Sequence, residues 1–369
     1  MNSIPEDVKR TAVEKSYLTP EMAISDEGVG IDLFINAMDT TAGERQGVDC
    51  IFGVYPAELK AIQDWVSVLA PAGRLTLVCP VEDHPKTIWL EMAGLVNRLT
   101  WEVDGWWVLT SCKRVPARES VQAAYSAKAL SQSGCDCGCS DGGCCSPGEV
   151  SLESLGSVEW VGGYSDAEVA EVPAEAAEFS LGCGNPIGMA GIKPGETVLD
   201  IGSGGGLDVF LAAKRAGPSG HAIGVDMTPA MLQRARNSAK RAGITNVTFR
   251  HGFAEHLPVE DSSVDVIISN CVINLAEDKG KVFAEAYRVI KPGGRLEVND
   301  MVFGGPVPQG IRTSKAGWSE CISGALPEQE YVDLVRQAGF SDVRVTRSTS
   351  HGEASGVPVY SVQVSAKKD

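Results

Sequence analysis

The sequence predicts an α/β protein whose larger part is a mostly parallel, seven-stranded sheet covered by helices, preceded by a smaller α/β domain. Three observations support this prediction. Short apolar runs alternate with helical patterns through the C-terminal half, as they do in proteins with a parallel sheet. One run ends in a turn with glycine at positions 202, 204, 205 and 206. A later helical pattern stops at Lys291-Pro-Gly-Gly294, a strong helix-ending signal.

The C-terminal elements follow one another in a regular order. Thr228 followed by Pro229 begins one helix, because a cap residue followed by proline suits the first helical turn. We expect strands at 197–202, 221–227, 247–250, 264–270 and 295–298, and helices at 207–216 and 281–290. The segments 343–347 and 360–365 are expected to form a terminal antiparallel pair.

The N-terminal part repeats a pattern found later in the chain. The stretch from Asp49 to Pro71-Ala-Gly-Arg resembles the stretch from Asp265 to Pro292-Gly-Gly-Arg, and Asp104-Gly105 is a good hairpin signal. We interpret this part as a degenerate relative of the C-terminal domain that lacks its glycine turn. An unrelated small α/β domain is the alternative.

The chain thus divides into three segments. Residues 1–125 form the smaller domain, residues 126–152 form a linker rich in cysteine and glycine, and residues 153–369 form the larger domain. The linker is small, polar and without an apolar period, so it is a linker or a loop organised by a ligand.

Composition and charge exclude some functions. The net charge of −16 would repel a phosphate backbone, so nucleic acid is not an expected partner. The N-terminus has neither the basic lead-in nor the apolar core of a secretory signal. No apolar run approaches the roughly 18 residues that span a bilayer, so we expect no membrane partner and a cytoplasmic location.

The cysteines point to metal, metalloid or redox chemistry. There are eleven, an odd number, so they cannot all pair within the chain. In a reducing compartment a dense cluster favours such chemistry over structural disulfides. Scattered thiols such as Cys50, Cys79 and Cys112 are interpreted as small core residues instead. The dense cluster comprises Cys135, Cys137, Cys139, Cys144 and Cys145.

A nucleotide-like cofactor is expected at the ends of successive strands. The dinucleotide fingerprint needs a glycine at position 207, which is leucine, whereas Asp-x-Gly-x-Gly-x-Gly suits S-adenosylmethionine. The carboxylate of Asp226 would accept hydrogen bonds from the ribose hydroxyls, and adenine would lie beside the segment that follows the third strand. The expected cofactor residues are Asp200, Gly202, Gly204, Gly206, Asp226, Met227, Ala254, Glu255 and Asn270.

Three further cysteines follow strands or precede the first one. Cys183 lies in a loop before the first strand, Cys271 ends the fourth, and Cys321 lies in the connection after the fifth. Thiolates are soft ligands and select soft acceptors, so together they could hold trivalent arsenic with its lone pair free. No general base would then be needed. His251 and His256 are interpreted as local structure.

At these residues the chain closely resembles the arsenite methyltransferases. The similarity covers about residues 160 to 345 and includes the stretches FSLGCGNP, VLDIGSGGGLD, IGVDMTPAML, SNCVINL and ECISGAL. It implies a class I methyltransferase fold of the Rossmann-like type and S-adenosylmethionine as cofactor. It also implies that arsenite, delivered as a thiol adduct, is the acceptor.

The resemblance also assigns roles to cysteines. It implies that Cys183, Cys271 and Cys321 are arsenic ligands, with no metal required for catalysis. Cys144 and Cys145 look like the family's upstream pair, which joins a thiol-disulfide cycle that thioredoxin or glutathione restores.

The chain departs from this family in two places. Cys135, Cys137 and Cys139 add three thiols, which makes them candidate ligands of a metal or cluster. The N-terminal domain is also additional. Followed by a cysteine-rich segment, it is loosely similar to anamorsin, whose leading domain is methyltransferase-like and lacks cofactor.

Two other functions stay open at the level of sequence. A small-molecule carbon or oxygen methyltransferase of the same fold would need a base or an apolar acceptor pocket. A metal- or metalloid-binding module would use the cysteine-rich segment, with the larger domain as its scaffold.

Overall fold

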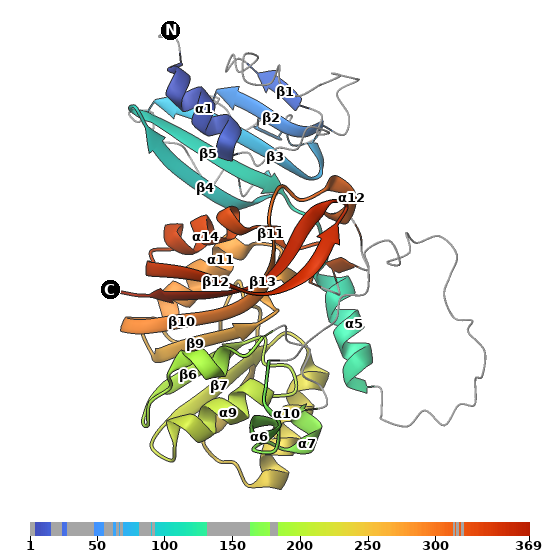
Figure 1. Ribbon diagram of the computed structural model, residues 1–369, viewed down its shortest axis with the longest axis vertical. Helices are drawn as coiled ribbons and strands as arrows, with labels where there is room; N and C mark the ends of the chain where they lie inside the picture. Colours follow the sequence, from blue (N-terminus) through green and yellow to red (C-terminus); the bar gives the residue numbers. More distant parts are fainter. Residues whose placement is uncertain are drawn as a thin grey trace, which may run out of the picture.

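The computed structural model describes most of the two expected domains. It covers residues 4–15, 24–27, 48–54, 69–80, 93–130, 163–177, 184–312 and 321–369, with 62, 63, 66, 90, 314, 317 and 318 besides. Figure 1 shows the two sheets one above the other along the long axis of the molecule. Within the described residues, no helix combines the length and the apolar character needed to cross a membrane.

The C-terminal sheet has the order β12-β13-β10-β9-β6-β7-β8, and a further short strand, β11, pairs with β10. Five neighbouring strands, from β10 through β9, β6 and β7 to β8, are parallel, whereas β13 is antiparallel to both β10 and β12. The seven strands of the main path are thus joined by an eighth of two residues. The bounds are β6 Thr197–Ile201, β7 His221–Asp226, β8 Val247–His251, β9 Val264–Asn270, β10 Ile290–Phe303, β11 Leu326–Pro327, β12 Ser341–Ala354 and β13 Val357–Lys367.

Helices cover both faces of this sheet, as the alternating pattern predicts. Helices α8, α9 and α10 share one apolar cluster with alternate residues of the strands. Helices α11 and α14 form the other cluster. The helical segments of this part are α6 Asp166–Val169, α7 Ala174–Ala177, α8 Pro186–Ala190, α9 Leu207–Ala216, α10 Pro229–Ala242, η2 Ile273–Leu275, α11 Lys279–Val289, α12 Gln309–Arg312 and α14 Glu328–Gln337.

Most predicted elements lie where the sequence places them. Helix α9 spans the expected residues, and the N-cap of α10 is Thr228. Helix α11 begins two residues earlier than expected, because Asp278 caps it by accepting a hydrogen bond from the backbone N of Lys281. The expected terminal antiparallel pair is strands β12 and β13.

The N-terminal domain contains a five-stranded sheet of order β1-β2-β3-β5-β4. The predicted hairpin is confirmed: β4 and β5 are antiparallel, and both Asp104 (φ 49°) and Gly105 (φ 77°) have left-handed backbone. The bounds are α1 Glu6–Lys15, β1 Ile24–Glu27, β2 Val48–Val54, β3 Leu69–Pro80, β4 Leu95–Val103 and β5 Trp106–Lys113.

The two sheets share one topology over five strands. The order β1-β2-β3-β5-β4 has the same sequence of parallel and antiparallel pairings as β6-β9-β10-β13-β12. The registers agree as well, since Arg74 pairs with Cys50 in one sheet as Arg295 pairs with Val266 in the other. The repeated sequence therefore folds as a repeated topology. This supports the interpretation that the N-terminal domain is a relative of the C-terminal one.

Helix α5, Arg118–Leu130, crosses the expected boundary at residue 125. Residues 126–130, which we assigned to the linker, are helical. The helix packs along α10 on the C-terminal domain (Figure 1), where the Nε of Arg234 donates to the carbonyl oxygen of Ala129. This packing stabilises the helix. It is a tertiary contact, and the small, polar sequence of residues 126–130 does not predict it.

Candidate active site

The glycine-rich turn joins β6 to α9 and forms the floor of the site. Gly202 has a φ of 81°, and a Cβ there would lie 2.3 Å from a methyl carbon of Val272. Only glycine fits both the backbone angle and this close approach. The turn therefore brings bare backbone to the carboxyl edge of the sheet, where ligands of such folds bind.

Asp226, at the end of β7, is held between this turn and helix α10. One carboxylate oxygen accepts a hydrogen bond from the backbone N of Gly204 at 2.9 Å. The other accepts from the backbone N of Thr228 at 2.7 Å. Burial raises the pKa of Asp226, although these hydrogen bonds oppose the shift.

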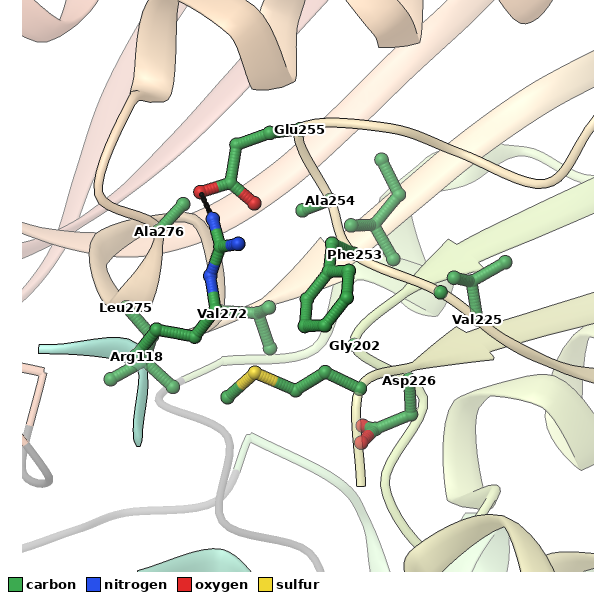
Figure 2. A pocket seen from close by; sticks show the side chains of 13 residues that line it. Arg118, Gly202, Val225, Asp226, Phe253, Ala254, Glu255, Val272, Leu275 and Ala276 are labelled. Carbon is green, nitrogen blue, oxygen red and sulfur yellow. Dashed lines mark hydrogen bonds and ion pairs between the residues drawn. The ribbon is translucent and has the colours of Figure 1, made fainter. Parts of the chain in front are cut away.

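Two adjoining cavities form one crevice above the turn, because Gly202 and Val272 line both. The first cavity, of about 470 Å³, lies between the ends of β7 and β8 (Figure 2). Its lining includes Asp226, Met227, Ala254 and Glu255. The second, of about 540 Å³, is lined by Asp200, Gly204, Asp208, Asn270 and Cys271. The crevice thus unites nearly all the cofactor residues expected from the sequence. Gly206, the N-cap of α9, does not line either cavity and acts through the shape of the turn.

Buried carboxylates dominate the second cavity. Burial raises the pKa of Asp200 well above its usual range, and the neighbouring Asp208 raises it further. Burial also raises the pKa of Asp208 to about 6, opposed by a hydrogen bond that the Tyr164 hydroxyl donates at 2.6 Å. Buried carboxylates of this kind are stabilised by a cationic ligand. S-adenosylmethionine carries an ammonium and a sulfonium, so the residues present fit this cofactor.

Asn270 organises the far end of the same cavity. Its side-chain Nδ2 donates to the Tyr164 hydroxyl at 2.8 Å and to the carbonyl oxygen of Gly184 at 2.7 Å. Its Oδ1 accepts from the backbone N of Gly184 at 3.2 Å. Asn270 therefore binds both backbone groups of the residue that follows Cys183 in the chain.

Cys271 and Cys321 meet at the edge of this cavity. The Cys321 thiol donates a hydrogen bond to the carbonyl oxygen of Cys271 at 3.0 Å. Both residues are buried, and both have left-handed backbone, with φ of 58° and 63°. Two of the three cysteines expected at the acceptor site are thus neighbours, although 50 residues separate them in the chain.

The state of these two cysteines differs. Cys321 is not in a disulfide, whereas Cys271 is disulfide-bonded. The remaining cysteines with expected roles lie outside the described residues; they are Cys183, Cys135, Cys137, Cys139, Cys144 and Cys145.

Burial controls the protonation of Cys321. It raises the pKa of this thiol to about 12, and the negative charge of Asp300 adds to the shift. The thiol is therefore protonated at neutral pH until a soft ligand displaces its proton.

His251, beside the crevice, makes a local contact: a ring nitrogen lies 3.1 Å from the carbonyl oxygen of Met227. His221, at the opposite end of β7, has a ring nitrogen 2.8 Å from the Thr248 hydroxyl. These contacts agree with the interpretation of His251 as local structure.

Helix α5 supplies residues beside the crevice that sequence reasoning missed. The guanidinium of Arg118 donates to Glu255 at 3.0 Å and lies 4.7 Å from the ring centre of Phe253, in the wall of the first cavity (Figure 2). The amide of Gln122 donates to the carbonyl oxygen of Met227 at 2.8 Å, and Tyr125 lines the second cavity. The helical spacing of positions 118, 122 and 125 was the available signal.

Comparisons with known proteins agree with this geometry. A family model described as a methyltransferase domain matches residues 192–339. An arsenic (III) S-adenosylmethionine methyltransferase from Chlamydomonas reinhardtii has a solved structure that is 39% identical, with a TM-score of 0.50, over 55% of this chain and 72% of that one. The chain belongs to the arsenite methyltransferase family. The class I methyltransferase fold expected from the resemblance is confirmed.

Curated members of the arsenite methyltransferase family are also similar. The arsenite methyltransferase of Halobacterium salinarum is 44% identical over 62% of this chain. That of Aquipseudomonas alcaligenes is 40% identical over 48% of this chain. The chain spans 58% and 53% of the lengths of these two relatives. Its similarity to them is therefore partial.

Proposed function

We propose that the protein transfers a methyl group from S-adenosylmethionine to trivalent arsenic held by cysteine sulfurs. The observation that carries this proposal is the meeting of Cys271 and Cys321 beside the carboxylate-lined crevice. Neither cysteine lies in a regular element; each lies in a loop at the carboxyl edge of the sheet. Both are buried, and Cys271 also lines the cavity that contains the expected cofactor residues Asp200 and Asn270.

The crevice would hold the cofactor along its whole length. Bound S-adenosylmethionine supplies an electrophilic methyl group. Asp226 would accept hydrogen bonds from the ribose hydroxyls, and the segment Phe253–Glu255 would flank the adenine. Asp200 and Asp208 would face the cationic end. These residues bind and orient, which is the main requirement of a methyl transfer.

The acceptor chemistry needs sulfur ligands rather than a base. Arsenous acid exchanges its hydroxyl groups for thiols, and each exchange forms one arsenic–sulfur bond and releases one water. Cys271 and Cys321, with Cys183 as the third sulfur, would leave the arsenic lone pair free. That lone pair would attack the methyl carbon as the methyl–sulfur bond of the sulfonium breaks and its electron pair stays on sulfur, so S-adenosylhomocysteine would leave and no proton would have to be removed from the acceptor.

A reductant is part of the proposal. Cys271 is disulfide-bonded in this structure, so its sulfur must be reduced before it can bind arsenic. We assign this step to thioredoxin or glutathione, with the Cys144–Cys145 pair taking part in the exchange. A cytoplasmic location would supply both reductants.

Substitution of an acceptor cysteine tests the function. Cys271→Ser should reduce arsenite methylation at least about a hundredfold, because serine is a poor ligand for a soft element. Its affinity for S-adenosylmethionine should stay within about threefold of wild type, because Cys271 is not among the groups assigned to bind the cofactor. Methylated arsenic is measured with methyl-labelled cofactor, and cofactor affinity by calorimetry.

Cys112→Ser is the matched control. Cys112 is a buried thiol of β5 in the N-terminal domain and is not in a disulfide. It should keep wild-type turnover. Full arsenite methylation by Cys271→Ser would refute the arsenic-ligand role. A wild-type protein that binds cofactor but methylates a carbon or oxygen acceptor instead of arsenite would refute the function itself.

A further inference from the structure

We propose that Arg118 of helix α5 is a positioning residue for recognition of the adenine base, because it fixes the carboxylate of Glu255. The inference deepens the proposed function and rests on the placement of adenine given there. It makes the first turn of α5 a part of the cofactor site, although this helix lies outside the segment matched as a methyltransferase domain, residues 192–339. The chemical class recognised is a purine that carries an exocyclic amine.

The carboxylate of Glu255 is held in one orientation by two donors. Its Oε1 accepts a hydrogen bond from the guanidinium of Arg118 at 3.0 Å and another from the backbone N of Glu277 at 3.2 Å. In the part of the chain that the structure describes, its Oε2 makes no hydrogen bond. Figure 2 shows this second oxygen turned away from Arg118, on the side of Ala254. Glu255 therefore keeps one acceptor for a ligand of the first cavity, which it lines.

The other walls of the first cavity suit a flat aromatic ring. Its lining includes the apolar residues Val272, Leu275 and Ala276 as well as Phe253. The guanidinium of Arg118 lies 4.7 Å from the centre of the Phe253 ring. A planar guanidinium can stack on a ring while it donates to a carboxylate, which an ammonium cannot do. Adenine would present an amine that donates to the carboxylate, whereas hypoxanthine has a carbonyl oxygen at that place, which the carboxylate would repel.

The backbone of Arg118 is held by the same residue that binds Glu255. The carboxylate of Glu277 accepts hydrogen bonds from the backbone N groups of Ala117 and Arg118, both at 3.1 Å, and so satisfies two donors at the beginning of α5. The backbone N of Glu277 in turn donates to Glu255. Arg118, Glu255 and Glu277 thus form a closed set of contacts that joins α5 to the loops after β8 and before α11. Such support is what a positioning residue requires.

The ion pair itself contributes little to the stability of the fold. The side chain of Arg118 is 39% exposed and that of Glu255 is 13% exposed. Water and salt screen an ion pair whose one partner is this exposed. Loss of the guanidinium would therefore mainly free the Glu255 carboxylate to rotate. Discrimination between bases would fall, whereas the contacts to the rest of the cofactor would remain.

The test compares two ligands of the full-length protein that differ only in the purine. S-adenosylhomocysteine carries the amine, and S-inosylhomocysteine has a carbonyl oxygen in its place. By calorimetry, the wild type should prefer S-adenosylhomocysteine at least about tenfold. Arg118→Met keeps a long side chain and removes the guanidinium, so the preference should fall below about threefold. A preference that stays at the wild-type value would overturn the proposal. General damage to the fold would weaken both ligands and leave their ratio unchanged.

A second substitution at the same position tests the cause. Arg118→Lys keeps a cation that can donate to Glu255 but lacks the planar group over Phe253. Its preference for S-adenosylhomocysteine should lie between those of the wild type and Arg118→Met. Equal preferences in the two variants would contradict the contact with Glu255 as the cause.

Arg344→Met is the matched control. Arg344 of β12 donates to both carboxylate oxygens of Asp342, at 3.0 and 2.8 Å, and its side chain is 72% exposed. It lines neither cavity of the crevice, so the variant should keep the wild-type preference. If Arg344→Met loses as much preference as Arg118→Met, the effect is general and the proposal is wrong.

The absence of arsenite from these measurements separates the inference from the proposed acceptor chemistry. If the wild type binds both ligands equally, the base is not recognised at Glu255 and the inference is wrong, whereas arsenite methylation is still measured by its own assay. If the wild type does not methylate arsenite, the proposed function fails. A preference that is lost in Arg118→Met would then still support the role of Arg118.

Discussion

At the scale of single residues, the acceptor cysteines are set apart by their backbone. Seven non-glycine residues of the described chain have positive φ, and the other five are Asn, Asp or Ser. Those residue types tolerate this conformation because their short polar side chains bond locally. Cysteine does not, and the left-handed form costs about 1–2 kcal/mol per residue. Strain at both cysteines is typical of functional sites.

The protonation of Cys321 predicts how arsenic binding responds to pH. Below its raised pKa of about 12 the residue is a neutral thiol, and arsenous acid is neutral as well. The exchange at Cys321 therefore releases water and no net proton. The affinity of the reduced protein for arsenite should change less than about threefold between about pH 6 and pH 8. Zinc is the comparison, because its binding to thiols releases protons and strengthens as pH rises. A tenfold change per pH unit for arsenite would contradict neutral exchange.

The raised pKa of Asp208 predicts that the affinity for the cofactor, unlike that for arsenite, depends on pH. Burial raises its pKa to about 6, so it is protonated below that pH and ionised above it. An ionised carboxylate attracts the cationic end of S-adenosylmethionine, so affinity should rise as pH increases through about 6 and level off near pH 7. Calorimetry at several pH values measures this, with Asp208→Asn as the control that should flatten the profile. Equal affinity at about pH 5 and pH 7 in the wild type would rule it out.

At the scale of elements, the turn before α9 is shaped by packing as well as by backbone angle. Gly206, the N-cap of α9, and Gly243, the C-cap of α10, both have left-handed backbone, with φ of 94° and 66°. A Cβ at Gly206 would lie 3.0 Å from the Phe249 ring, whereas a Cβ at Gly243 would meet nothing within 4 Å. The two positions therefore separate strain of the backbone from steric overlap.

Alanine at these two glycines tests that separation. Gly243→Ala should cost about 1 kcal/mol of the free energy of unfolding, which is the left-handed penalty alone. Gly206→Ala should cost about 2–4 kcal/mol and weaken cofactor binding, because Phe249 and Phe210 must also move. Denaturant unfolding measures both. Similar losses for the two variants would show that packing adds nothing at Gly206.

At the scale of the whole molecule, hydrogen bonds join the N-terminal domain to the C-terminal domain. Asn97, at an irregularity in β4 with a φ of 54°, accepts a hydrogen bond from the backbone N of Lys279 at 2.8 Å. Thr100 and Gln337 exchange two hydrogen bonds, at 2.8 and 2.9 Å. The hydrogen bond between Asn97 and Lys279 fixes the beginning of α11. Lys279 lies two residues after Glu277, which accepts hydrogen bonds from the backbone at the beginning of α5.

Substitution of Asn97 tests this interface. Asn97→Ala should lower the free energy of unfolding by about 2–4 kcal/mol, because it leaves the buried N–H of Lys279 unbonded and puts alanine in a left-handed conformation. Asn97→Gly removes only the hydrogen bond, so it should cost about 1 kcal/mol less. Urea unfolding of both variants gives the comparison. A loss below about 0.5 kcal/mol for both would mean that the contact does not join the domains.

Much of the fold and cofactor site could be predicted from the sequence. The strands around Asp200, Asp226 and Asn270 carry short-range signals, since their apolar period, glycines and stop signals act within a few residues. The repeated strand pattern of the N-terminal domain could be recognised for the same reason. The prediction failed at residues 126–130, whose helical state depends on packing against α10.

The sequence by itself determined the residue types at each strand end and therefore the chemistry available there. Only the tertiary structure decided that Cys321 lies against Cys271, and that Arg118 and Tyr125 come from outside the methyltransferase fold to line the crevice. The physical reason is that such contacts join residues separated by 50 to 137 positions. Local propensity acts over a few residues, whereas these long-range contacts are set by how the sheet, α5 and the loops pack.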